Sequence, residues 1–501
     1  MDSDATLDNL VAGMTIVYGG NRVTHIPQDL AEAFRAGDRL VVVHDTGALL
    51  HIPKSEHDTV YQAVGAAVES FSALGAVSDA AITDFYDVCA DNLADDEIFS
   101  LITVENKADV ADAKARGRST SRLILSEKMR SDMIDGLRTW RDAPSQRNVV
   151  TETIHHDGWH VDQIRCGLGV VGFVFEGRPN VFADATGVLR SGNTVVFRIG
   201  SDALRTARAI MRHALTPALE ASGLPSSSVV LVDVASHAGA WALFSDSRLA
   251  FAVARGSGGA VSQLGAVARQ AGIAVSLHGA GGAWIVAADD AEQTAFTEAV
   301  YNSLDRKVCN TLNTVAVVRS RAHELVPQFL DAFEHAAQRI GVSPKLHVRG
   351  RDQEYVPLSW WEDTTVTRPD GEHTESKTSV LDDASIGEEW EWDGSPEVTL
   401  IVVDTVAEAV SLFNEYSPRF VASLISADPG AHQMFFDQID APFVGNGFTR
   451  WVDGQYALLA PELGLSNWQS GRLFGRGAIL SGDSVFTVRS RVTQSDPSIG
   501  R

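Results

Sequence analysis

The stretch Val170-Val-Gly-Phe-Val-Phe-Glu-Gly-Arg-Pro-Asn-Val181 decides the fold, because an apolar run ends at a turn that leads into a helical pattern over residues 181–189. A second apolar run, Thr194-Val-Val-Phe197, follows that helix. Uninterrupted β-branched and aromatic runs are typical of strands that are buried on both faces. The order strand, helix, strand therefore predicts an α/β fold with a doubly wound parallel sheet.

The same alternation continues toward the C-terminus. The elements predicted in this way are strands at 228–232, 249–254, 284–287, 314–318 and 398–403 and a helix at 204–222. A second sheet domain is expected from about Val275. Toward the N-terminus, residues 55–140 have apolar positions three and four apart, which predicts helices. Residues 1–54 contain short β-like runs and form an appended segment of no assigned function.

Composition limits the classes of partner. The 501 residues are 45% hydrophobic, which indicates a globular chain of several domains. With 41 basic and 65 acidic residues, the net charge of −24 argues against nucleic acid and anionic membranes as partners. Neither a leader sequence nor an apolar run of membrane-spanning length is apparent. Three distant cysteines fit no disulfide framework and no zinc spacing, so we expect reduced thiols and a cytoplasmic protein.

Two polar segments carry competing interpretations. His155, His156 and His160 lie beside Asp157 and Asp162, but their spacing matches no known ligand pattern, so an exposed β-hairpin is favoured over a metal site. Residues 349–394 are interpreted as a variable, surface-exposed region. Within it, residues 388–392 (Glu-Glu-Trp-Glu-Trp) could form a binding stripe, although a solvated loop with anchoring aromatic side chains is favoured.

Five segments resemble, in the same order, the γ-glutamyl phosphate reductases, which are glutamate-5-semialdehyde dehydrogenases of the aldehyde dehydrogenase superfamily. These segments are 167–181, 191–198, 254–259, the run around Cys309, and 445–454 with 461–466. The resemblance covers residues 55–492. It implies a cofactor domain (55–149 and 167–274), a catalytic domain (275–475), and a β-hairpin (150–166). With the C-terminal strand (476–501), the hairpin would build a homodimer or homotetramer.

The resemblance implies an NADPH-dependent oxidoreductase of proline biosynthesis that reduces an amino-acid acyl phosphate, most simply γ-glutamyl phosphate, to the semialdehyde. Cys309 is the expected nucleophile, because a thiolate attacks an acyl carbon readily and the thioester can accept hydride. The alternative is that Cys309 is a small apolar side chain buried in the core, which is the usual role of a cysteine outside disulfides. Asn180 matches the superfamily's oxyanion donor, acting with the backbone N–H of Cys309, but it could also cap the following helix.

The expected cofactor contacts lie at or just after the carboxyl ends of predicted strands, where ligands of parallel sheets bind. Arg198 stands where relatives carry a lysine near the adenosine ribose, and an arginine suits a 2′-phosphate, which favours NADPH over NADH. Arg198 could instead pair with an acidic neighbour. Arg255, Gly256 and Ser257 would lie beside the pyrophosphate or nicotinamide, and Glu391 is a candidate for binding ribose.

The expected direction is acyl-phosphate reduction. Aldehyde-oxidising relatives carry a glutamate base that activates water, whereas this chain has Leu277 and His278 there. Phosphate would therefore exchange with the thioester in place of water. The candidates for holding a charged substrate are Arg178, Arg306, Thr449, Arg450 and Asp453.

Two departures leave the substrate open. The loop before Cys309 is about two residues shorter than in the family, and Asn313 replaces a common glutamate. An NAD(P)-dependent aldehyde dehydrogenase for another aldehyde in specialised metabolism therefore remains an alternative. So does a non-catalytic binding subunit on the same scaffold.

Overall fold

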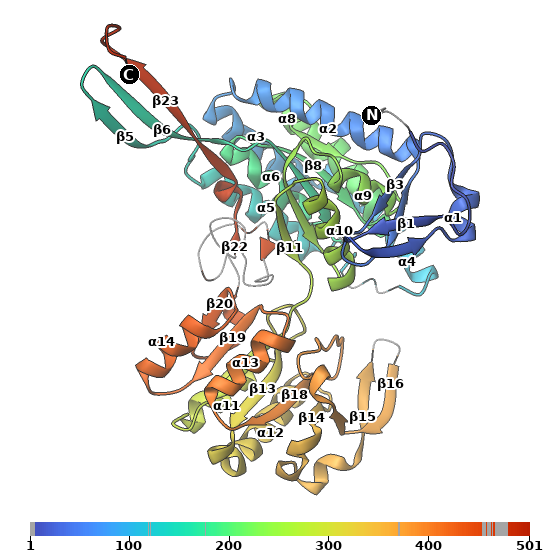
Figure 1. Ribbon diagram of the computed structural model, residues 1–501, viewed down its shortest axis with the longest axis vertical. Coiled ribbons are helices and arrows are strands. Elements are labelled where there is room, and N and C mark those ends of the chain that lie inside the picture. Colours follow the sequence, from blue (N-terminus) through green and yellow to red (C-terminus); the bar gives the residue numbers. More distant parts are fainter. Residues whose placement is uncertain are drawn as a thin grey trace. The chain divides into compact units, whose positions relative to one another are not determined.

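The computed structural model describes residues 6–118, 120, 122–175, 177–368, 371–452, 457, 462, 464–465 and 479–500 of the chain. The chain forms two compact units. The first comprises Met1–Gly279, Pro461–Gly464 and Leu480–Arg501, and the second comprises Ala280–Ala460 and Leu465–Ile479. Each contains one large parallel sheet with helices on its two faces (Figure 1).

The sheet of the first unit has five parallel strands in the order β11-β10-β7-β8-β9. The strands are β7 (Val170–Phe175), β8 (Thr194–Ile199), β9 (Val229–Leu231), β10 (Leu249–Arg255) and β11 (Val275–His278). Every residue of β7 and β8 is buried, which explains their continuous apolar runs. The chain proceeds from β7 to β9 on one side and then places β10 on the other side of β7, so the strand order reverses between β7 and β10.

Helices pack on both faces of this sheet. Their bounds are α2 (Lys54–Leu74), α3 (Asp79–Ala94), α4 (Asp96–Ala115), α5 (Glu127–Asp142), α6 (Val181–Thr186), α7 (Leu204–Ile210), α8 (Thr216–Ser222), α9 (Ala238–Phe244) and α10 (Gly258–Gln270). In β7, Val171 and Phe173 face the core shared with α3 to α8, whereas Val170 and Val174 face the core shared with α2, α9 and α10. The predicted helix at 204–222 is present but contains a π-helical turn at Met211–Leu215.

The appended segment consists of two β-hairpins and a short helix. Its elements are β1 (Thr15–Tyr18), β2 (Arg22–His25), α1 (Gln28–Ala33), β3 (Arg39–Val42) and β4 (Leu49–Ile52). Leu50 and Ile52 are buried in the core that includes α2. The side chain of Gln270 donates to the carbonyl of Val42 and accepts from the backbone N–H of His44. The segment is therefore a packed part of the first unit.

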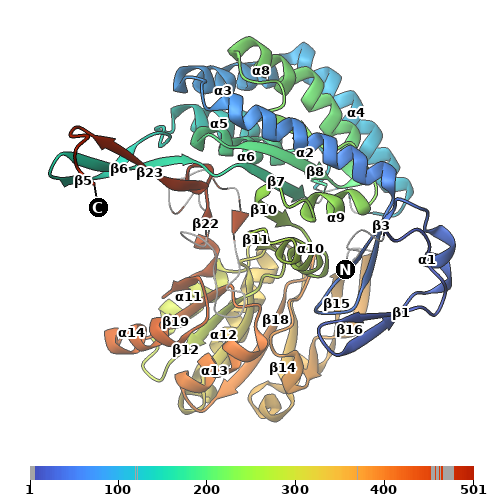
Figure 2. The same cartoon turned by 45° about the horizontal axis from the view of Figure 1, so that its top comes forward.

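A three-stranded antiparallel sheet extends from the first unit (Figure 2). It comprises β5 (Val150–His156), β6 (Trp159–Gly167) and β23 (Phe486–Gln494), and β23 pairs with β6 along its whole length. The hairpin interpretation of the histidine-rich segment is thus confirmed. His155 lies opposite His160, and His156 stacks on Trp159. No group of three or more potential metal ligands is found in the part of the chain that the structure describes.

The second unit has a seven-stranded parallel sheet in the order β17-β14-β18-β13-β12-β19-β20. Its strands are β12 (Ala283–Ala287), β13 (Leu312–Val318), β14 (Lys345–Arg349), β17 (Thr378–Leu381), β18 (Glu397–Val403), β19 (Val421–Ile425) and β20 (Phe443–Gly445). Helices α11 (Gln293–Asn302) and α12 (Ala322–Arg339) cover one face, and α13 (Val406–Tyr416) and α14 (Pro429–Gln438) the other. A hairpin, β15 (Asp363–Arg368) with β16 (Gly371–Ser376), lies outside this sheet. Short strands β21 (Gly464–Leu465) and β22 (Ile479–Leu480) lie where the chain passes between units.

The expectation that residues 349–394 are surface-exposed is wrong for part of that region. The guanidinium Nε of Arg349 donates to Asp352 at 2.7 Å, and both side chains are fully buried. Strand β17 is also a member of the large sheet. The polar composition of this region did not allow the buried ion pair or the sheet strand to be predicted. In the described residues, no helix is both long and apolar enough to span a bilayer.

Candidate active site

Cys309 lies in the second unit, in the turn that precedes β13. Two glycines before the neighbouring strand β12 hold this turn. The backbone N–H of Gly282 donates to the carbonyl of Cys309 at 2.6 Å. A Cβ at Gly281 would lie 2.5 Å from the Cα of Cys309. Gly282 has a φ of +104°, a conformation that favours glycine. The backbone at Cys309 therefore requires glycine at both positions.

Glu389 fixes this arrangement from a third segment. One carboxylate oxygen accepts from the backbone N–H of Gly281 at 2.5 Å, and the other binds the ammonium of Lys307 at 2.6 Å. The side chains of Lys307 and Glu389 are 6% and 15% exposed, so their charges are largely removed from water. Breaking a buried pair of this kind costs about 3 to 5 kcal/mol. The pair joins the two segments that meet at Cys309.

The residues after Cys309 are held by η8, a 3₁₀ turn at Thr449–Trp451. The hydroxyl of Thr449 donates to the carbonyl of Asn310 at 2.7 Å, and Asn310 Nδ2 donates to the carbonyl of Val452 at 2.8 Å. Arg450 binds Asp305 at 2.6 Å and also donates to Asn310. Two of the predicted substrate contacts, Thr449 and Arg450, thus hold the turn that carries Cys309.

The other predicted substrate contacts are placed differently. Arg306 is exposed, and its carbonyl accepts from the hydroxyl of Thr311 at 2.7 Å. Arg178 is an exposed residue of the first unit. Asp453 lies outside the described residues. The roles of these side chains in binding a substrate stay predictions.

The three thiols have different surroundings. Cys309 is half-buried against an apolar cluster that includes Phe420, Phe443 and Val452, together with Trp451. Cys89 is fully buried, and burial raises the pKa of its thiol to about 12, which keeps it protonated and unreactive. Cys309 is the thiol that lies in a turn fixed by glycines and an ion pair.

Asn313 anchors residues 388–390. Its Nδ2 donates to the carbonyl of Glu388 at 2.8 Å, and its Oδ1 accepts from the N–H of Trp390 at 2.9 Å. The indole of Trp390 donates to Thr399, and Trp392 is buried. Residues 388–392 thus form a loop anchored by aromatic side chains, as favoured. Glu391 is exposed there, and its ribose-binding role stays a prediction.

In the first unit, several predicted cofactor residues lie at one sheet edge. Arg198, Arg255 and His278 stand at or next to the carboxyl ends of β8, β10 and β11. The N–H of Gly256 donates to the carbonyl of His278 at 3.1 Å, and Ser257 precedes α10. Ligands of open parallel sheets bind beyond this edge, where the strand order reverses. The edge therefore has the topology of a nucleotide site.

Arg198 is buried and linked to a loop after β9. Its Nη2 donates to the carbonyls of Ala235 and Ser236, both at 2.9 Å. Within the described residues, its Nε is buried without an acceptor. The hydroxyl of Ser236 donates to the carboxylate of Glu56. Burial lowers the pKa of Arg198, and the charge of Glu56 opposes that shift. The proximity of Glu56 could not be predicted from the sequence, because no local pattern links the start of α2 to β8.

A cluster of charged groups surrounds Arg255. Its guanidinium binds Asp184 at 3.2 Å and Glu462 at 3.5 Å. Burial raises the pKa of Asp184 to about 7, partly offset by Arg255. Burial, Arg255 and Arg178 lower the pKa of His278 to about 3. His278 is therefore neutral near pH 7 and a weak general base. The role of Asp184 beside Arg255 could not be predicted either, since Asp184 belongs to no recognisable sequence motif.

The structure also shows where the side chains of Leu277 and Asn180 lie. Leu277 is buried against Gly265 of α10, so its side chain belongs to the core. Asn180 precedes α6, and its carbonyl accepts from the N–H of Ala183, but its side chain makes no capping hydrogen bond. Its Oδ1 is buried without a partner in the described residues. The side chain of Asn180 is therefore not used as a helix cap.

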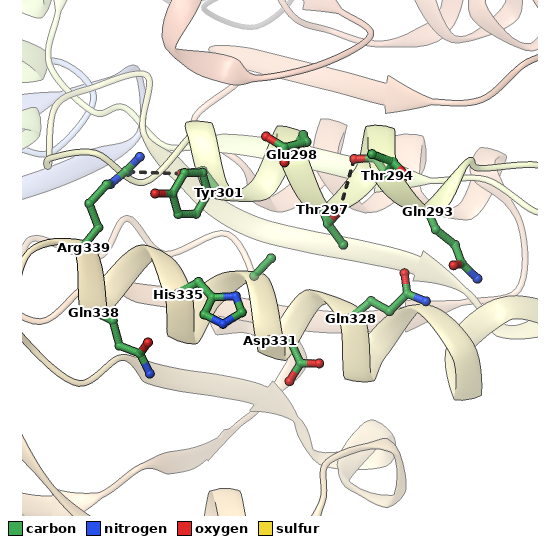
Figure 3. A pocket seen from close by; sticks show the side chains of 11 residues that line it. Gln293, Thr294, Thr297, Glu298, Tyr301, Gln328, Asp331, His335, Gln338 and Arg339 are labelled. Atoms are coloured by element: carbon green, nitrogen blue, oxygen red, sulfur yellow. Dashed lines mark hydrogen bonds between the residues drawn. The ribbon is translucent and has the colours of Figure 1, made fainter.

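An open groove of about 850 Å³ lies between α11 and α12 (Figure 3). Its walls carry polar side chains, among them Glu298, Gln328, Asp331 and His335, while Arg339 donates to the carbonyl of Tyr301. None of the predicted site residues lines it. This groove is separate from the Cys309 turn.

Comparisons with known proteins agree with the motifs. No family model matches the chain. A γ-glutamyl phosphate reductase of a Geobacillus species is 29% identical over 377 residues, 73% of this chain and 82% of the relative. The crystal structure of the γ-glutamyl phosphate reductase of Thermotoga maritima superposes with a TM-score of 0.76 at 22% identity, covering 89% of this chain and 100% of that one.

A more distant solved structure has the same fold. The acetylating aldehyde dehydrogenase of Geobacillus thermoglucosidasius superposes with a TM-score of 0.57 at 13% identity, covering 89% of this chain and 99% of that one. The aldehyde dehydrogenase-like fold and the resemblance to γ-glutamyl phosphate reductases are thus confirmed.

Proposed function

We propose that this protein catalyses the NADPH-dependent reduction of an amino-acid acyl phosphate, with γ-glutamyl phosphate as the expected substrate, to the semialdehyde. The observation that carries the proposal is the Cys309 turn, fixed by Gly281, Gly282 and Glu389 in a chain whose relatives are γ-glutamyl phosphate reductases. A rigidly held, half-buried thiol suits covalent catalysis.

The proposed chemistry begins with the thiolate of Cys309. Its sulfur attacks the acyl carbon, a C–S bond forms, and the C–O bond to phosphate breaks with the electron pair leaving on phosphate. A bound nicotinamide cofactor would supply the hydride that reduces the thioester. The resulting hemithioacetal collapses to the aldehyde and returns the thiolate. The proposal keeps Asn180 as oxyanion donor, which is supported by its lack of a capping hydrogen bond.

Residues of the first unit fit a dinucleotide. The buried Nε of Arg198 without an acceptor and the position of Arg255 where the strand order reverses both support a nucleotide at the carboxyl edge. The cation of Arg198 supports NADPH over NADH. The proposed cofactor contacts are Arg198, Arg255, Gly256, Ser257 and Glu391. The proposed substrate contacts are Arg178, Arg306, Thr449, Arg450 and Asp453.

The reductive direction is supported by the lack of a water-activating carboxylate at positions 277 and 278. Leu277 is in the core, and the lowered pKa of His278 makes it a poor acceptor of a proton from water. Exchange of the thioester with phosphate needs no such base. This supports acyl-phosphate chemistry over hydrolysis.

The proposal includes a homodimer or homotetramer built through the β5–β6–β23 sheet. Its edge strand β5 exposes Val150 and Ile154, and β23 exposes Val488 and Val492. Unpaired strand edges with apolar side chains favour pairing with another chain. A cytoplasmic location is also proposed, supported by the spacing of the three cysteines, which fits no disulfide framework.

The experiment that tests the function is the reverse reaction. Purified protein is mixed with glutamate-5-semialdehyde, NADP⁺ and phosphate, and NADPH is followed by absorbance. We expect phosphate-dependent NADPH formation that the Cys309→Ser variant abolishes. NADPH formation at a rate that does not depend on phosphate would instead favour an aldehyde dehydrogenase for another aldehyde.

A further inference from the structure

One acidic side chain is fixed beside the cofactor arginine. Ser236 connects the two, because its carbonyl accepts from Arg198 Nη2 at 2.9 Å while its hydroxyl donates to Glu56. The same hydroxyl accepts from the N–H of Ala238 at 3.1 Å, which fixes its orientation. Glu56 lies in the first turn of α2, immediately after the appended segment.

In the described part of the chain, Glu56 forms no ion pair with lysine or arginine, whereas its neighbour Asp58 binds Lys54. Across the loop, Asp233 is bound by Arg208. The carboxylate of Glu56 therefore acts on Arg198, a residue that is 4% exposed. Among the described residues, the side chain of Arg198 donates to two carbonyls, which carry no charge.

The 2′ position of the adenosine ribose distinguishes the two cofactors. NADP(H) carries a phosphate there, which Arg198 attracts and a nearby carboxylate repels. NAD(H) carries a hydroxyl, which can donate a hydrogen bond to a carboxylate. Adding a fixed negative charge beside the arginine thus shifts the balance toward NAD(H).

We propose that Glu56 is a specificity-determining residue that weakens the binding of a 2′-phosphate relative to a 2′-hydroxyl at Arg198. The inference rests on the proposed use of a nicotinamide dinucleotide at this edge. It adds to that function a carboxylate, next to the appended segment, that limits the preference for NADPH.

The test measures binding of 2′,5′-ADP and 5′-AMP, which differ only in the 2′-phosphate, to the full chain by calorimetry. In Glu56→Gln, the side-chain oxygen can still accept from Ser236, but the charge is gone. We expect the ratio of the two affinities to shift toward 2′,5′-ADP by about tenfold, and the shift to shrink in high salt. Asp58→Asn removes a carboxylate from the same helical turn that Lys54 already neutralises, and it should leave the ratio unchanged.

A second variant keeps the inference testable if Glu56→Gln fails to fold. Ser236→Ala releases the carboxylate of Glu56 and should shift the ratio in the same direction by a smaller factor. An unchanged ratio in both variants, or an equal shift in Asp58→Asn, would overturn the inference. Neither nucleotide contacts Cys309 or an acyl phosphate, so a shifted ratio supports the role of Glu56 even where the reductase assay fails.

Discussion

The backbone N–H of Gly282 donates a 2.6 Å hydrogen bond to the carbonyl of Cys309, so the thiol-bearing turn rests directly on the segment that begins β12. Gly281 makes the approach closer still, since a Cβ there would meet the Cα and the carbonyl oxygen of Cys309. The orientation of the Cys309 turn is therefore set by backbone contacts of two glycines.

Gly281→Ala should displace Cys309. We expect overpacking to cost about 1 to 3 kcal/mol of stability. Activity should fall about a hundredfold, since a displacement of 1 Å can have that effect. Steady-state kinetics and thermal melting measure both. Gly447→Ala is the control, because no heavy atom lies within 4 Å of a Cβ built there. Full activity in Gly281→Ala would contradict the role of this contact.

Glu389→Gln should loosen the same turn. It leaves the buried ammonium of Lys307 without a counter-charge, which we expect to cost about 3 kcal/mol. The melting temperature and the rate of alkylation of Cys309 by iodoacetamide are the measurements. Glu388→Gln removes an adjacent, exposed carboxylate and should change neither. Equal effects of the two variants would show that the ion pair is unimportant.

Asp184 should make stability depend on pH. Its folded-state pKa is raised to about 7 from an ordinary 3.8, so the folded chain binds more protons than the unfolded chain between these values. This contribution to stability is therefore lost as the pH rises through that window. Asp184→Asn does not titrate and keeps an acceptor for Arg255. Its melting temperature relative to wild type should be higher at pH 8 than at pH 5. Parallel curves would argue against a raised pKa.

His278 should not shape the activity profile near neutrality. Its pKa is lowered to about 3, so the imidazole stays neutral over about pH 6 to 9. His278→Gln should therefore leave the shape of the kcat/KM profile unchanged in this range, even where the absolute rate falls. Loss of a limb of the profile in the variant would identify His278 as a titrating base.

Strands and motifs could be predicted from sequence because their signals are local. The apolar runs of β7 and β8 were located to within two residues, since burial on both faces requires such runs. The turn that carries Cys309 could be proposed as a candidate site from the residues around it. The contact that holds this turn could not be predicted, because Glu389 meets Gly281 only after the chain has folded.

The same limit applies to the carboxyl edge of the sheet in the first unit. Arg198 and Arg255 follow apolar runs and could be proposed from strand ends. Their partners Glu56, Asp184 and Glu462 come from distant segments, and no spacing in the sequence joins them. Arg349 and Asp352 were likewise interpreted as surface residues, since a buried ion pair and an exposed loop share the same composition.

We expect an acyl group on Cys309 to be exchanged with phosphate and not with water. The decisive experiment mixes the protein with glutamate-5-semialdehyde and NADP⁺ in the absence of phosphate and then adds phosphate. A burst of NADPH stoichiometric with Cys309 should appear first, and continuous turnover should follow only after the addition. Continuous turnover without phosphate, or no response to it, would rule out exchange with phosphate.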